Sequence, residues 1–126
     1  MTMSSALFRY LTLPATVAHE LTHAVTGLPW ATRIAIEWRR SGTAVAHIDW
    51  RDNAPWWAIG MTALAPFAAG SLAATLALIQ WINGGMPTPS TPLGWSQWTI
   101  VAMWWVVFVA PSGDDLRASG VRGRSE

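Results

Sequence analysis

Hydrophobic residues along the chain are concentrated in three long runs, and the first of these covers residues 6–28. Only Arg9, His19, Glu20 and His23 interrupt it with ionisable side chains. At about 1.5 Å per residue, a helix of this length can cross a hydrocarbon core of roughly 30 Å. The pattern therefore predicts a first transmembrane helix over residues 6–28.

The second and third runs cover residues 55–82 and 95–110. The second contains no charged residue and is rich in Ala and Gly, which allow neighbouring helices to approach closely in lipid. It opens with Pro55, which is favoured in the first turn of a helix. The third stops before Pro111, where a helix is expected to end. Both runs predict transmembrane helices.

Between the first two runs, polar and apolar residues alternate with the period of a strand. Ser41 and Gly42 supply a tight turn, and the following residues predict a returning strand. A short β-hairpin is therefore expected over residues 31–50. The segment 112–126 is polar and is expected to form a frayed tail.

The composition favours a membrane protein. Hydrophobic residues make up 52% of the 126 residues, charged residues make up 12%, and ten residues are Trp. The charged share is about half that of a soluble domain, and Trp is enriched where apolar surface meets water at a bilayer. The expected fold class is an all-α membrane protein with three transmembrane helices and a short β-hairpin between helices one and two. Its length fits a single membrane-embedded domain, residues 1–126.

The charged residues predict how the protein is oriented in the membrane and argue against nucleic acid as a partner. The net charge of +1 argues against nucleic-acid binding. Arginines are concentrated in the segment 30–54 and in the tail 112–126, whereas the segment 83–94 has none. By the positive-inside rule, the hairpin and the C-terminus are expected to be cytoplasmic in a multi-pass protein of the cell membrane.

The candidate chemistry lies in His19-Glu20-Leu21-Thr22-His23, which matches the pattern H-E-x-x-H. Two imidazoles four residues apart lie on one helix face and can bind one metal ion. Zinc lowers the pKa of bound water towards about 7, and Glu20 can accept its proton during attack on a carbonyl. A chance match is the alternative, but ionisable groups in an apolar segment are costly and usually functional. The motif predicts a Zn²⁺ site with Glu20 as its catalytic base.

The sequence offers three candidates for a third ligand. The chain has no cysteine, which excludes thiolate ligands. His47 lies in the predicted hairpin, where a single histidine is more often a surface residue. Asp114 and Asp115 follow the third run, and the predicted topology places them on the same side as His19 and His23. The aspartates are therefore favoured, with the choice between them open.

The order of these elements resembles that of the site-2 protease-like intramembrane zinc metalloproteases. The most specific match to this family is the H-E-x-x-H segment at residues 19–23, and Pro111-Ser112-x-x-Asp115 is a less specific second match. The usual Leu-Asp-Gly around the third ligand is absent here. The resemblance implies zinc held by two histidines and one aspartate, and cleavage of peptide bonds within or near the membrane. It favours Asp115 as the ligand, with Asp114 as the alternative and His47 less favoured.

The expected function is that of a zinc-dependent intramembrane peptidase, a metalloendopeptidase acting on a membrane protein or peptide in the lipid bilayer. Two other functions compete with it. One is a non-catalytic membrane zinc-binding subunit, which would have no use for Glu20. The other is a structural membrane protein with a fortuitous motif, which metal analysis would distinguish from the first two.

Overall fold

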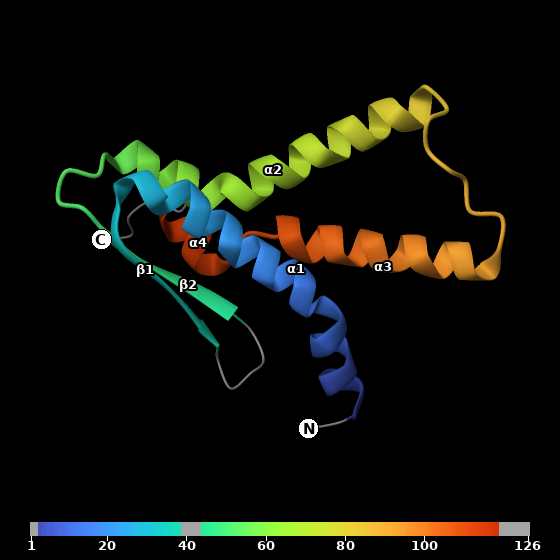
Figure 1. Ribbon diagram of the computed structural model, residues 1–126, viewed down its shortest axis with the longest axis horizontal. Coiled ribbons are helices and arrows are strands. Elements are labelled where there is room, and N and C mark those ends of the chain that lie inside the picture. Colours follow the sequence, from blue (N-terminus) through green and yellow to red (C-terminus); the bar gives the residue numbers. More distant parts are fainter. Residues whose placement is uncertain (1–2, 39–43, 119–126) are drawn as a thin grey trace.

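The computed structural model describes residues 3–38 and 44–118 (Figure 1). Four helices and one hairpin follow one another along the chain. They are α1 (Met3–Gly27), a short 3-10 turn (Leu28–Trp30), β1 (Ala31–Trp38), β2 (Ala44–Trp50), α2 (Trp56–Ile82), α3 (Pro92–Val109) and α4 (Gly113–Ala118).

The long helices lie close to the predicted ranges, and the starts of α1 and α3 each lie three residues earlier than predicted. Helix α3 begins at Pro92 rather than at residue 95. The Thr91 side chain accepts a hydrogen bond from the Gly94 N–H at 3.1 Å, which caps the first turn. Threonine followed by proline is a common helix start, because threonine satisfies an exposed N–H and proline needs no partner there.

The predicted β-hairpin is confirmed. Strands β1 and β2 pair in antiparallel fashion, with Ile34 opposite Ile48 and Ile36 opposite Ala46. Alternating side chains put one face of β2 against α1, where a Cβ on Gly27 would meet the Ile48 side chain at 3.0 Å. The predicted turn at residues 41–42 lies outside the described residues.

The expectation of a frayed tail is wrong for its first part, because residues 113–118 form α4. Ser112 and Asp115 hold the start of this helix through two reciprocal hydrogen bonds. The Ser112 N–H donates to Asp115 Oδ2 at 2.7 Å, and the Asp115 N–H donates to Ser112 Oγ at 3.1 Å. This exchange satisfies two N–H groups that a helix start leaves unpaired. The rest of the tail, residues 119–126, lies outside the described residues.

The expected fold class of three transmembrane helices is wrong. Among the described residues, α2 is the one helix both long and apolar enough to cross a membrane. The ionisable groups of α1 and the polar first turns of α3, with Ser96, Gln97 and Thr99, lower the hydropathy of these two helices. The structure instead contains four helices and a two-stranded sheet, with a single candidate membrane span.

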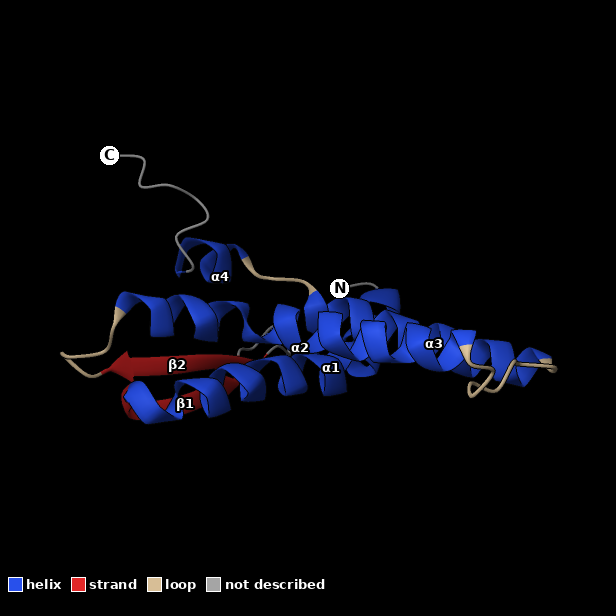
Figure 2. Ribbon diagram, turned by 90° about the horizontal axis from the view of Figure 1, so that it is seen from above, coloured by secondary structure: helices blue, strands red, loops and turns tan. Residues whose placement is uncertain are grey.

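The helices pack around α1. Helix α1 contacts α2 and α3, α2 contacts α3 and α4, and β2 runs along α1. Figures 1 and 2 show the hairpin, α4 and the first turns of α2 gathered at one end, while α2 and α3 extend towards the other end and diverge in Figure 1. Small side chains allow this close packing. The buried residues include Ala15, Ala24, Ala58, Ala63 and Pro66.

Candidate metal centre

Two buried histidines on α1 form the base of the site. His19 and His23 are each only 6% exposed, and their Nε2 atoms lie 3.0 Å apart. Their spacing of four residues places the two imidazoles one turn apart on the same face. The helical geometry expected from the sequence motif is therefore present.

Asp115 completes this cluster from a distant part of the chain. Its Oδ2 lies 3.5 Å from His19 Nε2, and its Oδ1 lies 3.3 Å from His23 Nε2. The three potential ligand atoms all lie within 4.8 Å of one another. Helix α4 thus brings a carboxylate onto the two imidazoles of α1.

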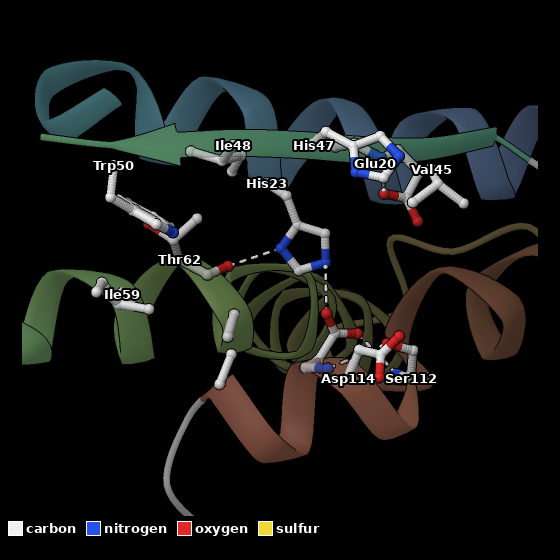
Figure 3. A pocket seen from close by; sticks show the side chains of 14 residues that line it. Glu20, His23, Val45, His47, Ile48, Trp50, Ile59, Thr62, Ser112 and Asp114 are labelled. Atoms are coloured by element: carbon white, nitrogen blue, oxygen red, sulfur yellow. Dashed lines mark hydrogen bonds and ion pairs between the residues drawn. The ribbon is translucent and has the colours of Figure 1, made fainter. Parts of the chain in front are cut away.

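Backbone carbonyls orient both imidazole rings. His19 Nδ1 lies 2.7 Å from the Phe108 carbonyl oxygen on α3. His23 Nδ1 lies 2.7 Å from the Thr62 carbonyl oxygen on α2 (Figure 3). A carbonyl oxygen can only accept, so each Nδ1 is the donor and carries a proton. In the neutral ring this leaves the Nε2 lone pair for a ligand, as in metal sites whose histidines are held by outer partners.

The donor set fits a metal ion. In the neutral imidazoles, two Nε2 lone pairs converge with the Asp115 carboxylate, so three electron-pair donors meet at one point. Such a group repels itself unless a proton or a metal cation lies among its members. Two imidazoles and one carboxylate suit zinc and several other first-row divalent ions. His19, His23 and Asp115 are the residues that would hold such an ion.

The neighbouring aspartate occupies a different position. Asp114 lines the pocket beside the cluster but does not belong to the group that can hold a metal. The Ser112 N–H fixes Asp115 Oδ2, which aims that carboxylate at the histidines. The geometry therefore favours Asp115 over Asp114, as the resemblance did.

His47 lies outside the cluster. Its Nε2 lies 3.4 Å from Glu37 Oε2, and its side chain is 51% exposed. This contact joins the two strands of the hairpin. His47 does line the same pocket as the cluster, and Figure 3 shows it on the β2 side.

Glu20 faces the same pocket from α1. The cavity lies between β2, α2 and α4, and Glu20, His23 and Asp115 all contribute to its wall. Glu20 is half-buried, and its Oε2 accepts a hydrogen bond from the Ala46 N–H at 2.7 Å. The remaining walls include apolar side chains such as Ile48 and Ile59. A carboxylate, a cluster that could hold a metal ion and an open cavity therefore adjoin one another.

Three groups that shape this site are not evident from the sequence: the carbonyls of Thr62 and Phe108 and the N–H of Ala46. All three belong to the backbone. Every residue carries such groups, so no residue type marks their position. Only the packing of α2, α3 and β2 against α1 reveals them.

Comparison with known proteins finds no matching family model, no matching curated protein and no matching solved structure.

Proposed function

We propose that this protein is a zinc-dependent peptidase that cleaves membrane-protein or peptide substrates within or near a lipid bilayer. The convergence of His19, His23 and Asp115 beside Glu20 is the observation that carries the proposal. Catalytic zinc sites commonly use three protein ligands and keep a further position for water or substrate. A purely structural zinc site more often has four protein ligands, and it needs no carboxylate base beside it.

The residues have separable roles in peptide hydrolysis. Bound zinc supplies Lewis acidity, which acidifies water and polarises a peptide carbonyl. Glu20 takes a proton from the attacking water as the new C–O bond forms. It then returns that proton to the amine nitrogen as the C–N bond breaks. The negative charge of Asp115 offsets part of the ion's charge in a region of low dielectric.

The outer surface supports a location in a membrane. Only 22% of the most apolar window of α2 is buried inside the molecule, whereas the core helix of a soluble protein is mostly buried. Soluble proteins rarely expose a continuous apolar surface of this kind. The exposed large apolar residues of α2 include Met61, Phe67, Leu72, Leu76, Leu78, Ile79, Trp81 and Ile82.

The proposed orientation places the active site towards the cytoplasm. The metal-binding cluster, the hairpin and α4 occupy one end of the molecule (Figure 1). The arginine distribution favours the cytoplasmic side for the hairpin and the C-terminal segment. Water for the reaction would then enter through the pocket at that end.

The decisive experiment compares the wild-type protein with Glu20→Gln in detergent or liposomes. We expect the wild type to bind about one zinc per chain and to cleave a reporter membrane peptide. Glu20→Gln should keep the zinc and lose roughly 100-fold to 10,000-fold in kcat, because only the base is removed. Zinc-loaded wild-type protein that cleaves nothing would favour a non-catalytic zinc-binding subunit. Cleavage by Glu20→Gln at the wild-type rate would exclude the proposed mechanism.

A further inference from the structure

We infer that the main-chain N–H of Ala46 on β2 is the positioning group for the catalytic base Glu20. This inference rests on the proposed peptidase function. The N–H donates to Glu20 Oε2 at 2.7 Å, across 26 positions of sequence. It joins the hairpin directly to the helix that carries both histidines.

The register of the hairpin explains why this N–H is available. Ala46 lies opposite Ile36 in the antiparallel pair. Along such a strand, successive residues direct their N–H and C=O groups alternately towards the partner and away from it. Because the Ala46 N–H reaches Glu20 on α1, it belongs to the edge of β2 that faces away from β1. The bond to Glu20 therefore takes no hydrogen bond from the β1–β2 ladder.

The bond restricts how the carboxylate can point. A glutamate side chain has several rotatable bonds, and a hydrogen bond to a charged acceptor is stronger than one between neutral groups. With Oε2 held by Ala46, Oε1 is the oxygen left for proton transfer, and Glu20 lines the same pocket as His23 and Asp115. The strand thus sets the position of the base without touching the metal ligands.

The hairpin is itself held in place against α1. Ile48, two residues along the same face of β2, packs at Gly27 near the C-terminal end of α1. If the pairing register of β2 shifted by one residue, the face that carries Ala46 and Ile48 would turn away from α1. The residue then opposite Glu20 would direct its N–H the other way. The register of β2 is therefore part of the catalytic geometry.

Ala46→Pro tests the inference, because proline has no N–H. Proline is tolerated in a strand where the N–H faces away from the partner strand. The matched control is Ala46→Gly, which keeps the N–H and removes only a methyl group. We expect Ala46→Pro to lower kcat by roughly 100-fold, as for a misplacement of about 1 Å, while KM and zinc content stay at their wild-type values. The loss of kcat in Ala46→Gly should be much smaller than in Ala46→Pro, because its N–H remains.

An ester at position 46 covers the case in which the proline variant does not fold. Replacing the Ala46 residue by its α-hydroxy acid exchanges the N–H for an oxygen of similar size. The same loss of kcat with unchanged KM and zinc content is expected.

The possible outcomes separate this inference from the proposed function. If the wild type cleaves the reporter and Glu20→Gln does not, the function stands. A folded Ala46→Pro or ester variant with wild-type kcat would then overturn only the role of Ala46. A loss of zinc in either variant would also overturn it, since the N–H would be acting on the metal site as a whole. If zinc-loaded wild-type protein cleaves nothing, both proposals fail.

Discussion

At the scale of single residues, the metal-facing nitrogens of His19 and His23 depend on groups far from them in the chain. The Phe108 and Thr62 carbonyls each bind an Nδ1 atom at 2.7 Å and direct Nε2 into the cluster. Asp115 is held in the same way by the Ser112 N–H. Each of the three side chains is therefore oriented before a metal ion binds, which limits the ordering that binding must impose.

The two adjacent aspartates differ in their expected effect on metal binding. Asp115→Ala removes one of three converging donors, so we expect zinc affinity to fall by roughly 100-fold or more. Asp114→Ala is the matched control and should retain nearly full affinity, because Asp114 lies outside the cluster. Zinc titration of the two purified variants measures the difference. A larger loss of zinc affinity in Asp114→Ala than in Asp115→Ala would identify Asp114 as the ligand instead.

His47 should be dispensable for metal binding. His47→Ala removes a contact with Glu37 on the hairpin surface and none within the cluster. We expect its zinc content to equal that of the wild type, whereas His23→Ala should lose the metal. Elemental analysis of both purified proteins provides the comparison. Loss of zinc from His47→Ala would show that the histidine reaches the ion in solution.

At the scale of elements, the contact between α2 and α3 bears on the metal site. These helices approach closely at Gly70, where an added Cβ would collide with the Val109 side chain and press on Phe108. The Gly70 carbonyl also accepts a hydrogen bond from Trp105 Nε1 at 2.9 Å. Because the Phe108 carbonyl orients His19, a shift of α3 here would also displace the His19 imidazole within the cluster.

Gly70→Ala is therefore expected to reduce both stability and zinc affinity. Overpacking at such a contact typically costs about 1–3 kcal/mol of unfolding free energy. Gly113→Ala is the control, because a Cβ at that position would have nothing within 4 Å although it too lies near the site. Thermal unfolding in detergent and zinc titration measure the two effects. Equal melting temperatures for both variants would show that α3 accommodates the added methyl group at Gly70 without a loss of unfolding free energy.

At the scale of the whole molecule, the candidate metal centre lies at one end, and large apolar side chains are exposed along the long helices. The cluster, Glu20 and the hairpin lie where α1, α2 and α4 meet. Farther along α2, large apolar side chains face outward. This division suits a protein whose helices contact lipid while its active site is open to water through the pocket.

Charges placed on the outer face of α2 should release the protein from membranes. Leu72 and Leu76 are 62% and 55% exposed, one turn apart. An arginine at the centre of a bilayer costs about 2.5–3.5 kcal/mol on insertion scales, so Leu72→Arg with Leu76→Arg should move protein out of the membrane fraction. The control pair is Thr88→Arg with Ser90→Arg in the loop before α3. Sedimentation after a carbonate wash tests this, and an unchanged membrane fraction would contradict a lipid-facing α2.

Much of the local structure was predictable because it depends on spacing along the chain. The period-two alternation predicted the hairpin, and the apolar runs predicted the three long helices. The spacing of His19 and His23 placed both imidazoles on one face of α1. The expected number of membrane spans was wrong, because counting apolar runs ignored the ionisable groups of α1 and the polar first turns of α3, which leave α2 as the one candidate among the described residues.

The order of residue types by itself determined the helix motif, the hairpin and a pair of candidate aspartates. Only the tertiary structure distinguished Asp115 from Asp114, because adjacent residues share the same sequence context and differ in which way α4 turns them. It alone also brought the Thr62, Phe108 and Ala46 backbone groups to the site. The physical reason is that local conformation follows from short-range side-chain patterns, whereas contacts between distant segments use backbone groups that all residues share.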